Sequence, residues 1–396
     1  MIFMENFITK IKINNVSHLK DIEINLPEDK RTHLILTGRN GSGKTSLLEA
    51  LKSNLSAINN GSWSHYKKYL TDKVNIKIYD DLYKKYHSGV NISFNRENNL
   101  DKKFEDGNFV TAYFTANRQT SIDFAHGVED IKFAGSYKFE QNPSQVLLKY
   151  MVHLKTQQAY AMLENKKQIT ENISAWFERF KTAIRNLIDD DTIDIVYEQK
   201  IYNFMIHQKG RAPFGLNELS DGYSSIIRIV SDLILRMDKN WLLKGQLTNC
   251  DIDGVVLIDE LETHLHIELQ RKILPFLTKF FPNIQFIVST HSPYIVTSIS
   301  NAVIYDLEKK VQFNDMSGYA IDIVAEGYFD ADNYSIKIKE MTKRLKELLD
   351  KTNITAEEQV ERAELCSKLE DVPGNLGLYI QSIIENIEWN GQNGKN

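Results

Sequence analysis

Cysteine is scarce in this chain of 396 residues, which contains only Cys250 and Cys366. Neither belongs to a CxxC pair, which argues against a disulfide framework and against a zinc site. Long apolar runs are also missing, since no stretch approaches the roughly 20 residues that span a bilayer. The first residues, MIFMENFITKIKINN, lack the apolar core and small-residue cleavage site of a leader. The sequence therefore predicts a protein of a reducing, cytoplasmic compartment with no membrane partner.

A net positive charge is absent as well, because the formal net charge is −5 at pH 7. No overall field that would attract nucleic acid is therefore expected. The segment 67–103 is rich in lysine, and a solvated surface is its ordinary interpretation. A local phosphate-binding patch there is the alternative, so nucleic acid stays open as a partner.

Short apolar strands alternate with helices in two parts of the chain. Continuous apolar strands of this kind predict an α/β fold with a parallel sheet covered on both faces. The first part has two strands around a turn and then a strand, a helix and two weaker strands: 8–26, 33–38, 46–58, 74–80 and 90–95. A strand at 110–119 and a helical lobe at 144–189 follow. The second part has a helix, a strand, a helix, a strand and a helical tail: 220–237, 254–260, 266–281, 284–292 and from 333 onward.

A glycine-rich loop follows the strand at 33–38 and opens the next helix. It fits GxxxxGK[ST] without mismatch, in the strand–loop–helix context that this phosphate-binding motif requires. Its main-chain N–H groups are expected to surround the β-phosphate, with Lys44 on the β- and γ-phosphates and Thr45 on Mg²⁺. A merely structural glycine turn is the alternative. The expected nucleotide-binding residues are Gly38, Arg39, Asn40, Gly41, Ser42, Gly43, Lys44, Thr45 and Ser46.

An acidic pair ends the apolar strand VVLIDE. Asp259 is placed by the strand end toward Mg²⁺, and Glu260 is placed to orient or deprotonate an attacking water. A DE pair after a strand is weak evidence alone. Together with the glycine loop it predicts the second half of a nucleotide hydrolysis site.

Two further motifs complete the set. STHSP (289–293) follows the next buried strand, so His291 is expected at the same sheet edge, where it can contact and sense the γ-phosphate; a structural histidine is the alternative. LSDGYSS (219–225) opens a helix, with Ser220 and Gly222 expected to be exposed at its N-terminus. This second helix N-terminus provides another anion-binding end.

The order GRNGSGKT, LSDGYSS, VVLIDE, STHS resembles the ATPase heads of the SMC, RecF and OLD-like branch of the ABC superfamily. The resemblance covers 8–58 and 214–308 and implies a P-loop NTPase of ABC type. In that family the glycine-rich loop is called the P-loop and LSDGYSS corresponds to the signature motif, and a helical lobe is inserted between the two. The resemblance implies ATP and Mg²⁺ as cofactors. It also implies a head-to-head homodimer or higher oligomer, in which Ser220 and Gly222 contact ATP bound to the partner protomer.

Other positions follow from the same resemblance. Gln119 occupies the place of the glutamine loop, with Arg118 and Asn117 as alternatives. ELETHLH, with Glu262, His264 and His266, falls where a dimer-interface loop and the following helix belong. The predicted division is an N-terminal part of the head at 1–58, an insertion at 59–213, a C-terminal part of the head at 214–325 and a helical interaction tail at 326–396.

The tail also contains AEGYFDADNY, in which Glu326, Asp330 and Asp332 could suggest a TOPRIM nuclease site like that of OLD-family proteins. Strand–helix alternation is missing around it, so no nuclease site is predicted. The chain is most similar to the ATPase component of Septu-type antiphage systems, including retron-associated ones. That resemblance implies a separate effector protein, a nuclease, as partner. A RecF-like DNA-repair ATPase and a transporter ATPase are the alternatives.

Overall fold

The predicted parallel sheet forms the centre of the protein. A computed structural model describes residues 5–72, 83, 85–96, 99–117, 123, 125–129, 136–237, 252–321, 324, 336–349, 351 and 354–369. The central sheet has the order β12-β11-β3-β10-β9-β5, with β12 antiparallel to β11 and the other pairs parallel. Its strands are β3 (His33–Thr37), β5 (Phe109–Phe114), β9 (Asp253–Ile258), β10 (Ile284–Ser289), β11 (Ala302–Asp306) and β12 (Val311–Asn314).

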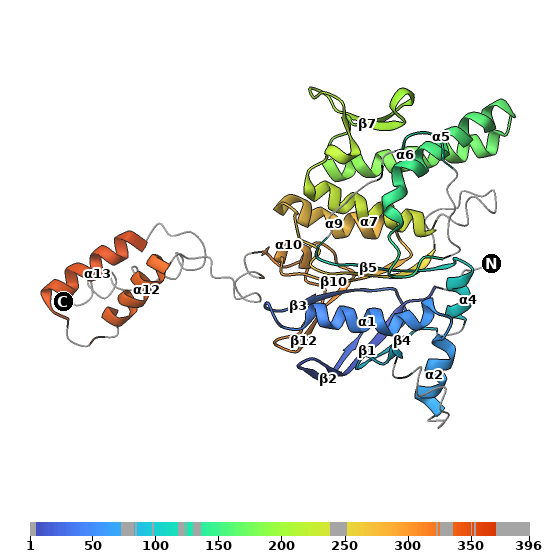
Figure 1. Cartoon of the computed structure of the whole chain (residues 1–396). Coiled ribbons are helices and arrows are strands. Elements are labelled where there is room, and N and C mark those ends of the chain that lie inside the picture. The colour runs from blue at the N-terminus through green and yellow to red at the C-terminus, as the bar shows by residue number, and fades with distance from the viewer. Residues whose placement is uncertain are drawn as a thin grey trace. The chain divides into compact units, whose positions relative to one another are not determined.

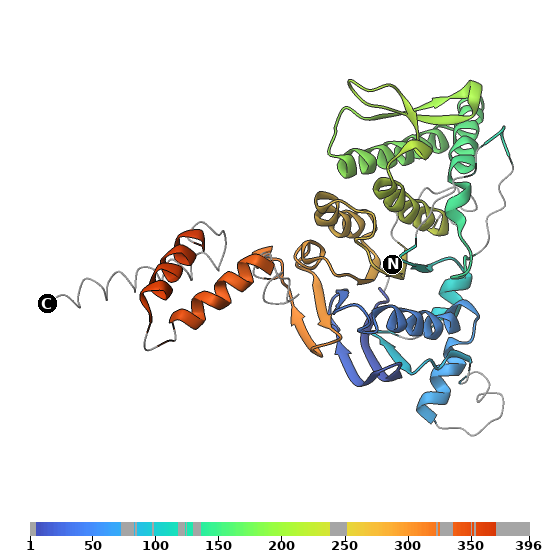
Figure 2. The ribbon, with the colours of Figure 1, turned by 60° about the vertical axis from the view of Figure 1, so that its left-hand side comes forward.

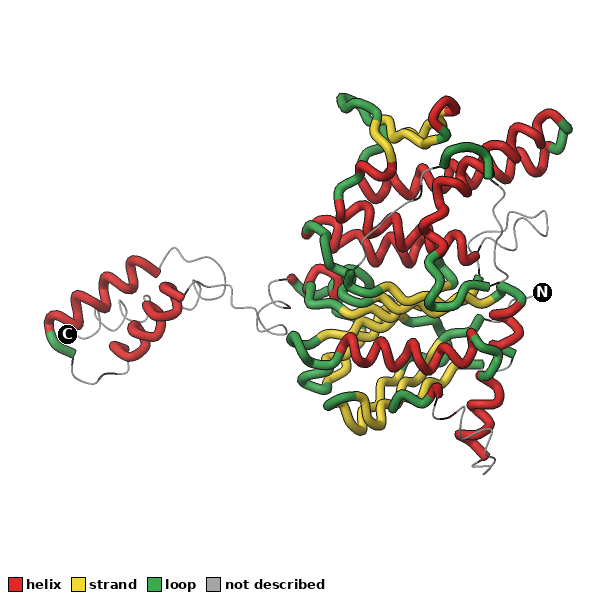
Figure 3. The backbone as a smooth tube through the Cα atoms, viewed as in Figure 1, coloured by secondary structure: helices red, strands yellow, loops and turns green. Residues whose placement is uncertain are grey.

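Layers lie on both faces of this sheet (Figures 1 and 3). Every residue of β3 and of β10 is buried, which explains why these strands are continuous apolar runs rather than alternating ones. On one face lies α1 (Lys44–Asn59), followed by a small antiparallel sheet in the order β2-β1-β4. The other elements of this layer are β1 (Ile8–Val16), β2 (Leu19–Asn25), α2 (Trp63–Asp72), β4 (Val90–Phe94) and α4 (Leu100–Glu105).

Helices cover the opposite face, and a small sheet lies beyond them (Figure 2). α7 contacts β5, and α9 contacts both α6 and α7. The helices are α5 (Leu147–Leu163), α6 (Lys167–Ile188), α7 (Asp221–Met237), α9 (Ile267–Phe280) and the short α10 (Pro293–Val296). The outer sheet, β6 (Asp194–Glu198), β7 (Asn203–His207) and β8 (Phe214–Gly215), was not predicted from the sequence, and neither were β11 and β12.

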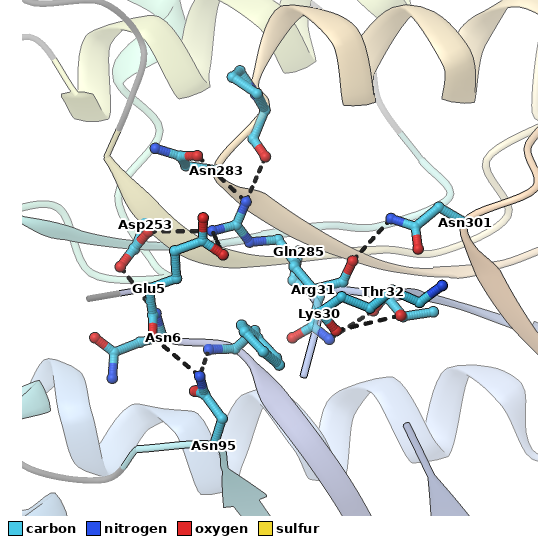
Figure 4. A network of polar contacts seen from close by, with 12 residues as sticks. Glu5, Asn6, Lys30, Arg31, Thr32, Asn95, Asp253, Asn283, Gln285 and Asn301 are labelled. Carbon is cyan, nitrogen blue, oxygen red and sulfur yellow. Dashed lines mark hydrogen bonds and ion pairs between the residues drawn. The ribbon is translucent and has the colours of Figure 1, made fainter. Parts of the chain in front are cut away.

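A polar network holds the amino-terminal edge of the central sheet to the β1 layer (Figure 4). Arg31 forms ion pairs with Asp253 at 3.4 Å and with Glu5 at 3.2 Å. The other oxygen of Asp253 accepts a hydrogen bond from the main chain of Asn6 at 3.0 Å. Gln285, fully buried on β10, bonds both to β1 and to the main chain before β3. The edge opposite the glycine loop is therefore fixed by charge and hydrogen bonding.

The chain separates into two compact units, Met1–Val324 and Ala325–Asn396. The second contains two helices of the predicted tail, α12 (Ile336–Leu349) and α13 (Ala356–Leu369), which share a small apolar core. The rest of the predicted helical tail, from residue 370 onward, lies outside the described residues. The start of α13 is a capping box: the main-chain N–H of Thr355 donates to the Glu358 carboxylate, and that of Glu358 donates to the Thr355 hydroxyl.

The range predicted as an insertion, 59–213, contributes β4 to the antiparallel sheet and β5 to the central sheet. Where the head ends and an insertion begins therefore stays a prediction. Across the described residues, no helix combines the length and apolar character that crossing a membrane requires.

Candidate functional site

The glycine loop joins β3 to α1 at the carboxyl edge of the central sheet. Gly38, Gly41 and Gly43 have φ values of 132°, 83° and 94°, which side-chain-bearing residues rarely adopt. A Cβ atom on Gly38 would lie 2.7 Å from the Ser42 hydroxyl oxygen. Only glycine therefore allows this loop to close, as the motif predicts.

Lys44 and Thr45 begin α1 directly after the loop. The buried Lys44 ammonium donates to the main-chain carbonyls of Gly38, at 2.8 Å, and Arg39, at 3.1 Å, so its side chain curls back over the loop. Burial lowers the pKa of Lys44, and the carboxylates of Glu262, Glu260, Asp259 and Asp306 act in the opposite direction. Arg39 and Asn40 are exposed on the loop, while Ser46 is half-buried one turn inside.

The acidic pair lies beside Thr45. The Thr45 hydroxyl donates to Asp259 Oδ2 at 2.8 Å, and the hydroxyl of the fully buried Ser289 donates to Asp259 Oδ1 at 2.5 Å. Ser289 in turn accepts the main-chain N–H of Glu260 at 2.7 Å. Glu260 has a φ of 44°, a left-handed conformation that is uncommon outside glycine. The chain thus turns sharply after β9, with Asp259 bonded to the residue after Lys44.

Ser289 lies in the STHSP motif but was not predicted as a site residue. Its position in the sequence could have indicated it, because it is the polar last residue of the buried strand β10, which lies between β3 and β9. Parallel neighbours bring their carboxyl ends to one edge, so its hydroxyl reaches Asp259.

His291 lies at the same edge, as expected. Its main-chain N–H donates to Glu262 Oε1. Its Nε2 and the second oxygen of Glu262 are both buried, and neither has a hydrogen-bond partner among the described residues. Burial lowers the pKa of His291, the Lys44 charge lowers it further, and the carboxylates of Glu262, Glu260 and Asp259 oppose both effects. The imidazole is therefore favoured in its neutral form near neutral pH.

The signature segment differs from the expectation at one residue. Ser220 is exposed before α7, as predicted, but Gly222 is buried. A Cβ at Gly222 would lie 2.7 Å from the main-chain oxygen of His264, so the glycine is required by close approach of two backbone segments within one protomer. The exposed position predicted for Gly222 was wrong, because a helix N-terminus can be covered by a segment distant in sequence.

The structure describes one of the three glutamine-loop candidates. Gln119 and Arg118 lie outside the described residues, as do Glu326, Asp330 and Asp332 of the tail. Asn117 is described, and it is exposed after β5. A contact that the sequence did not predict joins the glycine loop to the segment after β11: the Glu308 carboxylate accepts the main-chain N–H of Arg39 at 3.3 Å.

The donor set at this edge suits a magnesium–nucleotide complex. A threonine hydroxyl and an aspartate carboxylate, 2.8 Å apart, are the oxygen ligands that Mg²⁺ prefers. Lys44 and the first turn of α1 supply positive charge and N–H donors for phosphate oxygens. The roles of the individual residues stay predictions; the geometry brings Lys44, Thr45, Asp259, Glu260 and His291 to one edge.

Curated proteins similar to this chain include a Septu protein and a retron ATPase. The Septu protein PtuA of Bacillus mycoides (strain KBAB4) is 26% identical over 302 residues, which cover 73% of this chain and 38% of the relative. The retron Ec83 probable ATPase of Escherichia coli is 35% identical over 114 residues, which cover 29% of this chain and 21% of the relative. The matches thus span less than two-fifths of the length of either relative.

Among solved structures, an SMC head bound to the C-winged helix domain of ScpA aligns with 77% of this chain and 96% of its own length, at 12% identity and a TM-score of 0.40. A family model described as "AAA domain, putative AbiEii toxin, Type IV TA system" matches residues 71–297. The match covers more than half of the chain and contains the signature, the acidic pair and His291. With the P-loop that precedes it on the same sheet, the chain belongs to this AAA-domain family of P-loop ATPases.

Proposed function

We propose that this protein binds ATP with Mg²⁺ at the carboxyl edge of the central sheet and hydrolyses it to ADP and phosphate. One observation carries the proposal: the 2.8 Å hydrogen bond between Thr45 and Asp259 joins the end of the P-loop to the acid after β9. It brings the two halves of a P-loop hydrolysis site together from residues more than 200 positions apart in sequence.

In the proposed reaction, the P-loop N–H groups and Lys44 hold the β- and γ-phosphates. Thr45 and Asp259 would hold Mg²⁺, and the bound ion would supply positive charge next to the phosphate oxygens. Glu260 orients a water toward the γ-phosphorus and accepts its proton as the new P–O bond forms and the bond to the β–γ bridging oxygen breaks. His291, neutral because of its burial, contacts the γ-phosphate and registers its loss.

We infer further that two protomers close head to head around two ATP molecules. The exposed Ser220 at the start of α7 would then face the nucleotide of the partner protomer. Gly222, being buried against His264, would act by allowing α7 to begin at this position. Gln119 stays a proposed contact of the bound Mg²⁺ or phosphate.

The cellular role that fits best is antiphage defence. The names of the relatives, a Septu protein and a retron ATPase, support it. We propose that ATP-driven closure controls a separate effector protein, a nuclease, and that the helical tail contributes to its docking.

The first test is phosphate release by the wild-type protein with Mg-ATP. Lys44→Ala is expected to lose nucleotide binding, whereas Glu260→Gln is expected to bind ATP, to hydrolyse it about 100-fold or more slowly, and to accumulate as a dimer in light scattering. Hydrolysis by Glu260→Gln at the wild-type rate would contradict the catalytic assignment. A monomer at all nucleotide concentrations would contradict the sandwich dimer.

The partner is tested by purifying Glu260→Gln from its host with Mg-ATP and identifying what accompanies it. A stoichiometric nuclease supports the effector proposal. DNA with repair factors and no effector would favour the RecF-like alternative instead.

A further inference from the structure

Two loops of the site are linked at several points. The loop after β9 carries Glu260, and the loop after β10 carries His291. The main-chain N–H of Leu261 donates to the Ser289 carbonyl at 3.0 Å, in addition to the bond from Glu260 to the Ser289 hydroxyl. Farther along, the Ser292 hydroxyl donates to Gln270, whose amide donates to the Leu265 carbonyl. The two loops therefore form one hydrogen-bonded unit.

Between these links, the side chain of Glu262 joins the two loops at His291. Glu262 Oε1 accepts the main-chain N–H of His291, and Glu262 Oε2 has no hydrogen-bond partner in the described part of the chain. A buried carboxylate oxygen without a partner costs free energy. Its neighbour His291 Nε2 is buried and equally without a partner there. Glu262 Oε2 and His291 Nε2 are thus two buried polar atoms, on residues joined by a hydrogen bond, that have no partner in the described part of the chain. Such atoms indicate a place where a ligand binds rather than one that stabilises the fold.

Glu262 also lies near the charge of Lys44, since its carboxylate has the largest effect of any acid on that ammonium. Lys44 is the residue expected to hold the β- and γ-phosphates, so Glu262 lies near the proposed phosphate site, although it lies outside the acidic pair. The left-handed conformations of Glu260, at a φ of 44°, and of His264, at a φ of 65°, bracket it. Between these two residues, Glu262 contacts the segment just after β10 through its hydrogen bond from His291.

We propose that Glu262 is a positioning residue of the ATPase, which fixes His291 toward the end of the bound triphosphate by accepting its main-chain hydrogen bond. The inference rests on the proposed function and adds a residue to it. Glu262 acts through its acceptor oxygen, so a neutral side chain with an oxygen at the same position should be able to replace it. Glutamine has that oxygen and alanine does not.

The test compares Glu262→Ala with Glu262→Gln. Alanine is expected to lower kcat about 10-fold or more, with KM for ATP changed less than about 3-fold, because the γ-phosphate contact rather than overall binding is lost. Glutamine is expected to stay within about 3-fold of wild-type kcat. Wild-type kcat in the alanine variant, or equal loss in both variants, would overturn the proposal. Glu23, an exposed acid on β2 paired with Lys10, gives matched control variants with unchanged activity.

A double-mutant cycle with His291→Ala separates positioning from general damage. If Glu262 acts through His291, the double variant should have the kcat of His291→Ala alone. Additive losses would mean that Glu262 does not act through the histidine and would overturn the proposal.

Hydrogen exchange provides a readout that needs no hydrolysis. The amide of His291 should exchange faster in Glu262→Ala and unchanged in Glu262→Gln, with the rest of β10 unaffected. Equal protection of that amide in all three proteins would show that the contact does not hold the loop. If the wild-type protein releases no phosphate above the Lys44→Ala background, the proposed function fails, and the exchange result still decides the positioning of His291.

Discussion

The two ends of strand β9 carry the same chemical group in opposite settings. Asp253, where the strand begins, pairs with Arg31 and accepts the Asn6 N–H, so both oxygens are engaged with groups that only hold the fold together. Asp259, just after the strand ends, accepts hydrogen bonds from Thr45 and Ser289, both of which lie in motifs proposed to serve the nucleotide site. The same carboxylate is structural at one edge of the sheet and is proposed to be functional at the other.

The surroundings of the two aspartates explain the contrast. The carboxyl edge contains Glu260 and His264 in left-handed conformations, which cost of order 1–3 kcal/mol each, and open buried atoms on Glu262 and His291. At the amino edge a single guanidinium, that of Arg31, meets two carboxylates, although its Nε has no partner among the described residues. The carboxyl edge thus has backbone strain and unpartnered polar atoms beside the proposed chemistry, whereas the amino edge is held by charge pairing.

The largest effect should follow from changing the acid at the carboxyl end. Asp259→Asn removes a charged ligand from the proposed Mg²⁺ site and is expected to lower kcat/KM for ATP about 100-fold or more, while the free energy of unfolding changes by less than about 1 kcal/mol. Phosphate release and urea unfolding measure the two quantities. Substantial unfolding of the variant, with activity retained per folded molecule, would make Asp259 a structural residue like Asp253.

The amino end should give the reverse result. Arg31→Ala leaves the half-buried Asp253 without its cation and is expected to destabilise the head by about 3 kcal/mol in urea unfolding. The folded fraction should keep kcat within about 2-fold, since Arg31 lies at the edge opposite the P-loop. A loss of kcat without a loss of stability would contradict the assignment of a purely structural role to the amino edge.

Sequence patterns predicted the functional edge better than the rest of the molecule. β3, β9 and β10 are buried on both faces, so their apolar runs are visible in the sequence, and their motifs follow directly. β6 (DIVYE) buries Ile195 and Tyr197 only in part and exposes the apolar Val196 between them, so apolar and polar residues do not alternate and no periodic pattern marks it. The partner strands β7 and β8 follow it, so the whole outer sheet was missed.

Contacts between motifs were beyond what the sequence can predict. The bond of Glu262 to His291 joins residues 29 positions apart, and the approach of His264 to Gly222 requires both chain paths to be known. The family resemblance implied a nucleotide contact for Gly222 in the signature, and the structure adds a steric reason for this glycine within the protomer. Residue type therefore indicated which residues are candidates for the site, whereas the contacts among them became known only from the fold.

A smaller effect should appear on lowering the pH, again at the amino end. Burial, with a contribution from Arg31, lowers the pKa of His33 from 6.5 to about 4, and its Nδ1 accepts the Phe286 N–H at 3.1 Å. The folded state therefore binds fewer protons than the unfolded state between these values, and stability is lost as the pH falls through this window.

We expect this linkage to remove about 2 kcal/mol between pH 7 and pH 5. His33→Asn keeps a hydrogen-bond acceptor but cannot titrate, so the variant should not lose this part of its free energy of unfolding. The amount by which the wild type is more stable than the variant should therefore fall by about 2 kcal/mol from pH 7 to pH 5. A difference independent of pH would show that His33 titrates normally in the folded protein.

The smallest effect is expected at the carboxyl edge, where Arg39 lies on the P-loop beside Glu308. Their side chains form an ion pair at 3.7 Å with 67% and 41% of the side chains exposed, a setting in which such pairs contribute little. Arg39→Ala should therefore change the free energy of unfolding by less than about 0.5 kcal/mol. If Arg39 contacts the nucleotide, KM for ATP should rise several-fold while stability stays the same. If the variant is instead destabilised and its KM for ATP is unchanged, surface charges stabilise the carboxyl edge as well. Charged residues would then have a structural role at both ends of β9.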